Sequence, residues 1–327
     1  MPWATRLERR ILTFGKQRLV WQALDPRLRE VDLVVLEQAS RLLLNYRLLW
    51  LQARGGPRIA FWGHGRSFAA DPTSVSERLK AWASRRAHWW FAYSSVSSGI
   101  VTALGFEPDR ITVVNNSIDT ATLREQLDAV DEARLATLRD QIGLSPGPVG
   151  LFLGTLRSDK GLGVLVEAGR RIRDAHDGFS LLVVGSGPLE DEVRQWAEQE
   201  SWLHYLGPRY GSDRAELLSL ADLMLLPGAV GLVVLDAIVA GTPLITSRES
   251  PHGPEIGYLR DGSNGLLVAN GSDPASYADA VLRLLDQPVQ LEALVEGCAA
   301  DRDLYTVEEM VRRFGDGIRR ALDAPPR

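Results

Sequence analysis

One segment of the chain combines glycine, helix and carboxylate in the way that a site for a phosphate and a ribose requires. Residues 227–243 read Pro-Gly-Ala-Val-Gly-Leu-Val-Val-Leu-Asp-Ala-Ile-Val-Ala-Gly-Thr-Pro, which predicts a strand end, a turn and a helix. The helix-start N–H groups of Gly231, Leu232 and Val233 carry the positive dipole end and favour an anion by about 0.3–1 kcal/mol. Asp236, one turn later, could accept hydrogen bonds from two sugar hydroxyls. The alternative is an ordinary buried helix of an α/β sheet.

Two cations lie in a loop that follows an apolar run. Residues 154–161 read Gly-Thr-Leu-Arg-Ser-Asp-Lys-Gly, between the run 149–153 and an apolar helix pattern. Open α/β sheets bind ligands at the carboxyl ends of their strands. Lys160 and Arg157, in the loop that Gly154 opens, are therefore candidates to hold a diphosphate, with charge-assisted bonds of about 1.5–3 kcal/mol each. The alternative is a basic loop that faces solvent.

Glycines and an aromatic ring follow the next two apolar runs. Val184-Gly-Ser-Gly-Pro-Leu189 predicts a tight turn into a helix, but no third glycine completes a dinucleotide-binding fingerprint. Gly185 and Gly187 therefore indicate close passage of a ligand or of a neighbouring strand. Tyr205, which opens the segment 205–210, offers a ring that could hold a base.

A histidine between two glycines follows an early apolar run. In Phe61-Trp-Gly-His-Gly-Arg66 the glycines let a ligand approach His64, which can donate, accept or carry a proton near neutral pH. A structural or exposed histidine is the alternative. His252 and Glu255 follow another run and are candidates for the same cleft. No His, Cys or Asp cluster has metal-ligand spacing, and neither a Gly-x-Ser-x-Gly turn nor a P-loop is present.

Strands alternate with helices along the whole chain. Apolar runs predict strands at 31–36, 59–62, 89–93, 111–114, 149–153, 180–184, 202–206, 223–226, 244–246 and 265–268. Helices are expected near 39–53, 73–87 and 95–104 and between the later strands. Because continuous apolar strands joined by helices form buried parallel sheets, the pattern predicts two doubly wound, Rossmann-like α/β domains.

Proline and glycine mark the expected boundary between the domains. Ser145-Pro-Gly-Pro148 follows a polar helical stretch at 131–142. Residues 1–144 are then the first domain, 145–305 the second, and 306–327 a terminal helix opened by the capping box Thr306-Val-Glu-Glu309. Such a helix can cross back and pack on the first domain.

The two parts of the chain differ in charge. Residues 1–110 hold 17 Lys and Arg against 9 Asp and Glu, and the remainder holds 20 against 33. Seven of the nine tryptophans also lie in the basic part: Trp3, Trp21, Trp50, Trp62, Trp82, Trp89 and Trp90. Cations beside aromatics at 78–91 suit an anionic membrane surface, and the alternative is a solvated helix followed by a core strand. The net charge of −5 and the lack of a recognition motif argue against nucleic acid.

The remaining composition points to a reducing compartment. Cys298 is the only cysteine, which rules out an internal disulfide framework. No apolar run reaches the length of about 18 residues that spans a bilayer, and the N-terminus lacks the apolar core of a secretion signal. We therefore expect a cytoplasmic protein that contacts the inner membrane face at its periphery.

Taken together in their order, these segments resemble the retaining glycosyltransferases of family four, which have the GT-B fold. The matching pieces are Trp62-Gly-His64, Ile111–Asp119, Gly154–Gly161, Val184–Leu189, Tyr205–Gly207, Ala221–Pro227, Gly231–Pro243 and Glu255–Leu267. Each piece is modest and their order is specific. The resemblance covers roughly residues 31–320 and implies two Rossmann-like domains that face each other across a cleft.

The resemblance also implies an activity. In this family a sugar moves from a nucleotide-diphosphate sugar with retained anomeric configuration and without a metal or other cofactor. The lysine that holds the diphosphate corresponds to Lys160, the acid that binds the ribose to Asp236, and the histidine beside the transferred sugar to His64. Cations and helix-start amides would then stabilise the departing diphosphate while the acceptor attacks from the same face.

Three departures from the family pattern are visible. The first acid of the family's Glu-x7-Glu motif falls on Gly228, so backbone amides from 229 to 232 are expected to hold the sugar instead. The arginine usual beside the lysine loop falls on Thr155, with Arg157 close enough to substitute. Residues 1–30 contain neither the usual first strand nor its glycine-rich loop, so the first domain is expected to be shortened.

The sequence thus predicts a glycosyltransferase that acts on a lipid-linked or polysaccharide acceptor at the cytoplasmic membrane face. Two alternatives stay open. One is a catalytically weakened partner that binds a nucleotide sugar within a membrane assembly. The other is a GT-B epimerase or phosphorylase.

Overall fold

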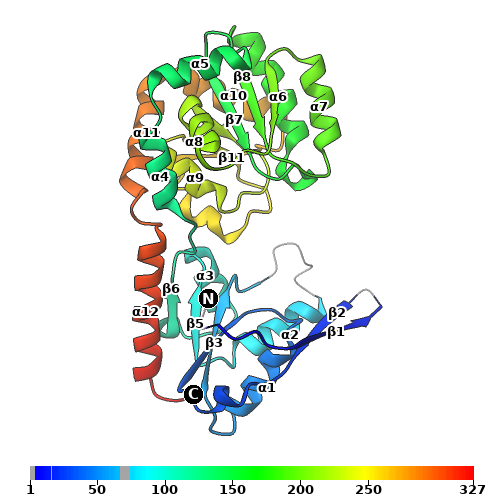
Figure 1. The fold of residues 1–327 in the computed structure, drawn as a ribbon, viewed down its shortest axis with the longest axis vertical. Helices are drawn as coiled ribbons and strands as arrows, with labels where there is room; N and C mark the ends of the chain where they lie inside the picture. Colours follow the sequence, from blue (N-terminus) through cyan, green and yellow to red (C-terminus); the bar gives the residue numbers. More distant parts are fainter. Residues whose placement is uncertain (1–3, 16, 67–73) are drawn as a thin grey trace. The chain divides into compact units, whose positions relative to one another are not determined.

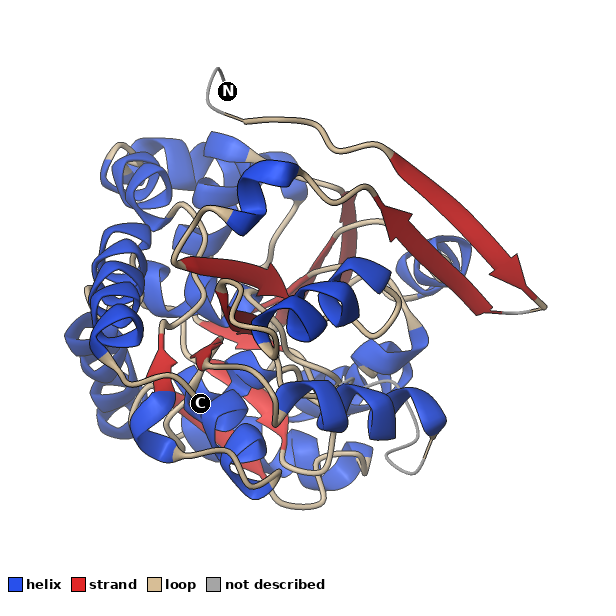
Figure 2. Ribbon diagram, turned by 90° about the horizontal axis from the view of Figure 1, so that it is seen from below, coloured by secondary structure: helices blue, strands red, loops and turns tan. Residues whose placement is uncertain are grey.

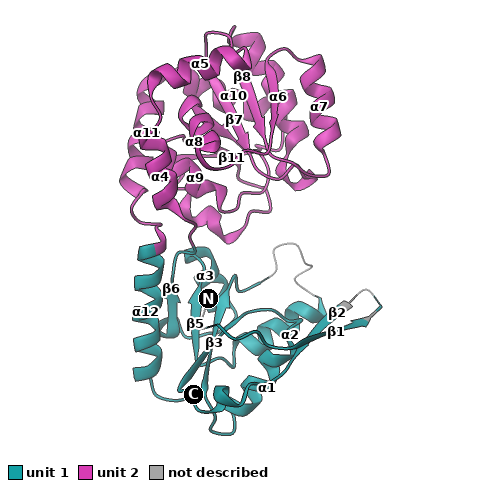
Figure 3. Cartoon of the chain, in the orientation of Figure 1, with its two compact units in different colours: residues 1–116, 308–327 teal, residues 117–307 magenta. Residues whose placement is uncertain are grey.

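The computed structural model describes residues 4–15, 17–66 and 74–327, and its contacts divide the chain into two units (Figures 1 and 3). Unit 1 comprises Met1–Asn116 and Glu308–Arg327, and unit 2 comprises Ser117–Val307. Both units are built from strands and helices (Figure 2). Within the described residues, no helix is both long enough and apolar enough to cross a bilayer.

Unit 2 contains a fully parallel six-stranded sheet in the order β12-β11-β10-β7-β8-β9. Its strands are β7 Val149–Leu153, β8 Ser180–Val184, β9 Leu203–Gly207, β10 Leu223–Leu225, β11 Leu244–Ser247 and β12 Gly265–Val268. The chain order reverses between β7 and β10. Open α/β sheets bind ligands beyond the carboxyl ends of the strands at such a point, so the loops after β7 and β10 are where a site is expected.

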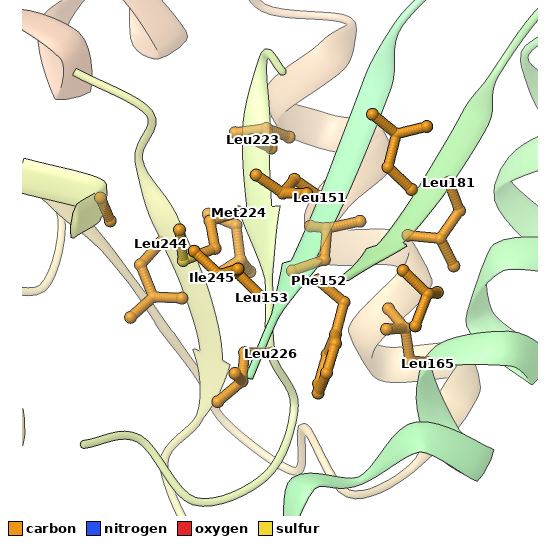
Figure 4. Packing of buried hydrophobic residues seen from close by; sticks show 14 of the residues in the cluster. Leu151, Phe152, Leu153, Leu165, Leu181, Leu223, Met224, Leu226, Leu244 and Ile245 are labelled. Carbon is orange, nitrogen blue, oxygen red and sulfur yellow. The ribbon is translucent and has the colours of Figure 1, made fainter. Parts of the chain in front are cut away.

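Helices cover both faces of this sheet. They are α4 Thr120–Asp128, α5 Glu132–Ile142, α6 Leu162–Ala175, α7 Glu190–Gln199, α8 Gly211–Leu220, α9 Val233–Ala240, α10 Pro274–Leu285 and α11 Pro288–Asp301, with short 3₁₀ turns η3 Ser158–Lys160 and η4 Pro254–Tyr258. Every residue of β7, β8, β10 and β11 is buried. Figure 4 shows Leu151, Phe152, Met224 and Ile245 in this core. Burial on both faces explains why these strands read as continuous apolar runs.

The structure places the boundary between the units near residue 117 and not at 145. Leu123 of α4 is fully buried in the core of unit 2, where α4 packs on α8 and α9. On α5, Arg134 pairs with Glu216 at 2.8 Å. The Pro-Gly turn at 145–148 therefore joins elements of one unit, because α4 and α5 need the apolar surface of α8 and α9 to bury their own.

Unit 1 contains a parallel four-stranded sheet in the order β3-β4-β5-β6, made of β3 Leu33–Glu37, β4 Arg58–Gly63, β5 Trp89–Ala92 and β6 Ile111–Val113. Helices α1 Leu43–Gln52, α2 Val75–Ser84 and α3 Ser95–Ala103 contribute to the cluster on one face, with the turns η1 Pro26–Arg29 and η2 Pro108–Arg110 nearby in sequence. The other face packs on α12, Val307–Asp323. Phe314 of α12 stacks on Phe91 with centroids 4.2 Å apart. The ten strands predicted from the apolar runs are all present.

The aromatic pair at 89–90 belongs to the core and not to a lipid-facing surface. Trp89 is 2% exposed and Trp90 is fully buried. They lie on opposite faces of β5, which is paired on both sides. Successive strand residues point to opposite faces, and both faces of this sheet are covered. The interpretation of residues 89–91 as interfacial aromatics is therefore wrong, and the core-strand alternative is correct.

The N-terminal segment forms an antiparallel hairpin that the sequence did not predict. Strands β1 Arg9–Phe14 and β2 Gln17–Gln22 pair with each other and not with the parallel sheet. Gly15, at a φ of 58°, supplies the turn. A parallel first strand with a glycine-rich loop is accordingly not formed by the described residues of this segment.

Candidate functional site

A cavity of 370 Å³ lies at the carboxyl edge of the sheet in unit 2. It is lined by Ile118, Leu153, Gly154, Thr155, Val184, Gly185, Ser186, Pro208, Arg209, Tyr210, Arg214, Leu232, Val233 and Asp236. Five of the predicted site residues therefore share one cavity: Gly154, Gly185, Leu232, Val233 and Asp236. They come from the loops after β7, β8 and β10 and from the start of α9, as the topology of the sheet requires.

The loop after β10 is held by backbone and side-chain hydrogen bonds on two sides. On one side, Gly228 N donates to Lys160 O at 3.1 Å and Ala229 N donates to the carbonyl of Asp159 at 2.7 Å. On the other side, Ser250 Oγ donates to Pro227 O at 2.8 Å. The loop therefore presents the start of α9 in a fixed position, which is what preorganised binding needs.

Three backbone N–H groups at the start of α9 have no acceptor among the described residues. They belong to Gly231, Leu232 and Val233, and Leu232 provides no side-chain cap. Two of the amides from 229 to 232 that were expected to hold the sugar are already engaged by the protein. Ala229 N donates to Asp159 O, and Val230 N donates to His252 Nδ1 at 3.1 Å. Only the later amides remain available to an anion.

Lys160 connects the loop after β7 with the loop after β10, where the chain order of the sheet reverses. Its Nζ donates to the carbonyl oxygen of Ala229. Burial lowers the pKa of Lys160, and the neighbouring Asp159 opposes that change. The chain has 37 Lys and Arg residues, yet Lys160 is the only lysine after residue 80. A compact ammonium fits between two backbones where the planar fork of arginine would not.

Arg157 is engaged by its own loop. Its Nε and Nη2 donate to Asp159 at 3.0 and 2.9 Å, and its side chain is 58% exposed. It does not line the cavity. The structure therefore places Arg157 beside the site with its charge already compensated by a carboxylate.

No space exists for a side chain at Gly228. A Cβ atom there would lie 2.2 Å from the carbonyl carbon of Lys160 and 2.3 Å from the carbonyl oxygen of Asp159. Both atoms belong to a backbone and cannot rotate away. In this chain the backbone of Asp159 and Lys160 occupies the space that an acidic side chain at position 228 would need. Packing therefore requires glycine there.

Gly185 and Gly187 allow two loops to run side by side. A Cβ at Gly185 would lie 1.8 Å from the carbonyl oxygen of Gly154, and one at Gly187 would lie 2.5 Å from Leu156 O. Of the two uses that the sequence left open, close passage of a neighbouring segment is thus observed. Gly187 does not line the cavity.

Tyr205 contacts the loop that carries Gly185. Its hydroxyl donates to the carbonyl of Gly185 at 3.0 Å, and the guanidinium of Arg194 lies 4.7 Å from its ring centroid. Tyr205 does not line the cavity, whereas Tyr210 does and is 79% exposed. Tyr210 is therefore the ring of the segment 205–210 that a base can reach.

Asp236 is the buried carboxylate of the cavity. Its side chain is 8% exposed, and Arg214 Nη1 lies 3.2 Å from its Oδ1. This oxygen accepts no hydrogen bond from the described residues. Burial raises the pKa of Asp236 to about 6, although Arg214 acts in the opposite direction. A buried carboxylate oxygen without a hydrogen bond is costly, and a bound ligand is one way in which such an atom finds its partner.

Because its pKa is raised in the folded state, Asp236 should destabilise the protein at neutral pH. The contribution of Asp236 to the free energy of unfolding is then most favourable below pH 3.8 and falls by about 2–3 kcal/mol as the pH rises to about 6. We expect Asp236→Asn to raise the free energy of unfolding at about pH 7 by up to about 2 kcal/mol and to leave it unchanged near pH 4. Urea denaturation at both pH values measures this, and a loss of stability at pH 7 would contradict it.

His252 and Glu255 lie close to the loop after β10. His252 is 9% exposed; its Nδ1 accepts from Val230, so its Nε2 carries the proton and donates to Ser247 O at 2.6 Å. Burial lowers the pKa of His252, which keeps it neutral. Glu255 is 6% exposed, in η4. Neither lines the cavity, and His252 acts as a support for the loop.

His64 lines a second cavity, of 320 Å³, in unit 1. The other lining residues are Glu37, Gln38, Ala39, Ser40, Arg41, Gly63, Arg66, Lys80 and Tyr93. The rings of His64 and Tyr93 form a T-shaped pair with centroids 4.4 Å apart. Burial, followed by the charge of Lys80, lowers the pKa of His64, while Glu37 raises it. The imidazole is therefore neutral near pH 7 and able to accept a hydrogen bond.

Gln38 fixes the turn that carries His64. Its Nε2 donates to Gly65 O at 3.2 Å and its Oε1 accepts from Gly65 N at 3.1 Å. Sequence reasoning missed Gln38, and it missed Arg214 in unit 2. Both lie just beyond a strand end or in the first turn of a helix, which is the positional signal that could have identified them. Within the described part of the chain, no group of three or more His, Cys, Asp and Glu residues is arranged to hold a metal.

Comparisons with known proteins agree with this architecture. Residues 147–287 match the family of glycosyl transferases group 1. The chain is 35% identical over 240 residues to the D-inositol 3-phosphate glycosyltransferase of Acidothermus cellulolyticus. This alignment covers 67% of the chain and 51% of that protein. It is 31% identical over 224 residues to a glycogen synthase of Mycobacterium tuberculosis, covering 65% and 50%. The chain spans about half the length of these relatives.

Solved structures show the same fold at low sequence identity. The Anabaena protein Alr3699/HepE in complex with UDP has a TM-score of 0.69 and 18% identity, covering 90% of this chain and 80% of that one. Sucrose-phosphate synthase from Thermosynechococcus elongatus has a TM-score of 0.68 and 19% identity, covering 90% and 75%.

Proposed function

This chain is a GT-B protein of the family-four type, and from that premise we propose that it transfers a sugar from a nucleotide-diphosphate sugar to a lipid-linked or polysaccharide acceptor. The observation that carries the proposal is the cavity of unit 2 at the carboxyl edge of its sheet. It places the carboxylate of Asp236 and unpartnered amides of the α9 start in one space of 370 Å³.

The chemistry of these groups suits a nucleoside diphosphate. The carboxylate of Asp236 accepts hydrogen bonds from the two ribose hydroxyls. The amides at the start of α9 donate to the diphosphate, and Lys160 adds a positive charge from the adjoining loop. As the bond between the sugar and the diphosphate breaks, negative charge grows on the leaving group, and donors that are fixed beforehand stabilise it. The proposal includes retention of anomeric configuration and independence of metal.

We assign the acceptor to unit 1. The cavity around His64 has three cations, Arg41, Arg66 and Lys80, against the single carboxylate Glu37 on its lining. His64 is neutral and lies in the turn that Gln38 fixes. It can accept a hydrogen bond from a sugar hydroxyl. In this assignment His64 positions the acceptor and does not act as an acid.

The test is a transfer assay. The protein is incubated with a panel of labelled nucleotide sugars and lipid or polysaccharide extracts, without added metal, and the product's anomeric configuration is determined by NMR. Transfer with retention and release of nucleoside diphosphate is expected. Release of sugar to water alone, or inversion, would contradict the proposal.

A second candidate function is favoured by Gly228. Without the acid, and with no space for one, the chain could bind the nucleotide sugar without turning it over, as a partner in a membrane assembly. Tight donor binding together with no transfer to any acceptor supports this function, whereas transfer by the isolated chain excludes it.

We further propose that unit 1 contacts anionic lipid through exposed side chains of β1, α1 and α2. Ile11 is 57% exposed and Trp50 54% exposed. The guanidinium of Arg54 lies 3.6 Å from the Trp50 ring centroid, and that of Arg86 lies 4.1 Å from Trp82. Arginines over exposed tryptophans combine charge attraction with interfacial burial.

We expect vesicles with anionic lipid to retain the protein and neutral vesicles to release it. About 1 M salt, where the Debye length is about 3 Å, should also release it. Replacing Arg9 and Arg10 of the hairpin by Glu should reduce retention at least about tenfold, at about 1 kcal/mol for each lost cation. Val289→Ala, at an exposed position of unit 2, is the control. Equal retention on neutral vesicles would contradict the electrostatic account.

A further inference from the structure

The 370 Å³ cavity of unit 2 is the proposed donor cavity. Arg214 is the one residue on its lining that neither the sequence motifs nor the family resemblance identified. It lies in the first turn of α8, and its side chain is 26% exposed. Its Nη1 lies 3.2 Å from Asp236 Oδ1 on α9, and both residues line the same cavity as Gly154 and Gly185. Arg214 therefore brings a positive charge to the carboxylate that the proposed function assigns to the ribose.

The geometry of the pair is incomplete without a ligand. Asp236 Oδ1 and Arg214 Nε are both buried, and neither has a hydrogen-bond partner among the described residues. The ion pair is close enough for strong attraction but does not satisfy these atoms. Buried polar atoms in native structures are almost always paired, so a ligand that carries hydroxyl groups is the expected partner for the carboxylate.

We infer that Arg214 is a positioning residue of the donor site, which keeps Asp236 ionised and oriented so that the carboxylate accepts the ribose diol of a nucleoside diphosphate. The inference rests on the proposed function. Aspartate is one methylene shorter than the glutamate usual in the family, and here its side chain is 8% exposed, which makes ionisation harder. A cation at hydrogen-bonding distance offsets that cost.

Other ionisable groups do not substitute for Arg214. The cavity is also lined by Arg209 and Tyr210. The further elements that pack on α9 carry Arg124, Glu125 and Asp128 on α4, Glu255 and Tyr258 on η4, and Glu292, Glu296, Cys298 and Asp301 on α11, and α8 itself also carries Asp213 and Glu216. Arg124 pairs with Asp303 at 2.6 Å. Among the described residues, Arg214 is the charge that shifts the pKa of Asp236, and it shifts it downward against the effect of burial.

The loss of Arg214 should consequently change the pH dependence of nucleotide binding. Because the carboxylate must be ionised to accept two hydroxyls, wild-type affinity falls as the pH falls through about 6. Removing an opposite charge at this distance raises a carboxyl pKa by about 1–3. In Arg214→Gln the loss of affinity should therefore begin at a higher pH, and binding should recover in alkaline solution.

Calorimetric titration with UDP between about pH 5.5 and 9 tests this. We expect Arg214→Gln to bind UDP about tenfold more weakly than wild type at pH 7 and about equally at pH 9. Arg214→Lys, which keeps the charge, should restore the wild-type midpoint. Arg209→Gln, a charge loss on the same cavity, should leave the midpoint unchanged, and Asp236→Asn should abolish the pH dependence. Thermal melting confirms that each variant is folded.

The outcomes separate this inference from the proposed function. If wild type binds UDP and Arg214→Gln shows an equal loss at every pH, or none, the positioning role is wrong while the donor site stands. If wild type binds neither UDP nor GDP, the proposed function itself fails.

Discussion

Replacing Lys160 by alanine is expected to lower kcat/KM for sugar transfer by about 10²–10³-fold, which corresponds to about 2.7–4 kcal/mol of transition-state stabilisation. Lys160 Nζ donates to the carbonyl of Ala229, two residues before the first of the unpartnered amides at the start of α9, so its charge lies in the loop that presents these amides. The negative charge on the diphosphate is greatest as it departs, so the loss should fall mainly on kcat. Initial rates at saturating and at limiting donor measure this division.

Two variants serve as controls for Lys160. Arg157→Ala removes a neighbouring cation that is 58% exposed and already paired with Asp159, so it should cost less than about tenfold. Lys160→Arg keeps the charge but not the shape, and should recover only part of the activity. Equal activity of Lys160→Ala and wild type would remove Lys160 from the mechanism.

Restoring an acid at Gly228 should damage the protein and not activate it. A Cβ atom at this position would overlap the backbone of Lys160 and Asp159 at 2.2–2.3 Å. Overpacking of a dense interior usually costs about 1–3 kcal/mol, and a collision with backbone should reach the upper end of that range or exceed it. We expect Gly228→Glu to lower the free energy of unfolding by about 3 kcal/mol or more and to reduce transfer at least tenfold, because the lysine loop must move.

Gly231→Ala is the matched control, since a Cβ there meets no atom within 4 Å. It should stay within about 0.5 kcal/mol of wild type. Chemical denaturation measures stability, and the transfer assay measures activity. A Gly228→Glu variant that is as stable as wild type and more active would show that the loop yields and that an acid is tolerated.

Much of the fold could be predicted because buried parallel strands are recognisable from apolar runs alone. Residues 149–153 and 180–184 became β7 and β8 without change. The hairpin at 9–22 was missed because β1 is exposed, most of β2 is only half-buried, and both strands carry cations and lack a continuous apolar pattern. Gly15 was the available signal. The boundary was misplaced because Pro and Gly mark a turn, whereas membership of a unit depends on which apolar surface buries Leu123.

The site was predicted where local pattern determines position and missed where packing determines it. Asp236 and the amides of the α9 start follow from a strand, a turn and a helix in sequence. The reason for Gly228 lies in a loop almost 70 residues earlier in the chain, and Arg214 looks like any arginine of a polar helix until α8 and α9 pack together. Trp89 and Trp90 were ambiguous for a similar reason, since composition cannot distinguish an interfacial aromatic from a core one.

The measurement that tests the account most directly is the structure of the protein crystallised with UDP- and GDP-sugars. The account predicts a nucleotide in the cavity of unit 2, its ribose hydroxyls on Asp236, and its diphosphate at the amides of Leu232 and Val233 within reach of Lys160 Nζ. A nucleotide bound elsewhere, or a cavity that stays empty at saturating nucleotide sugar, would contradict it.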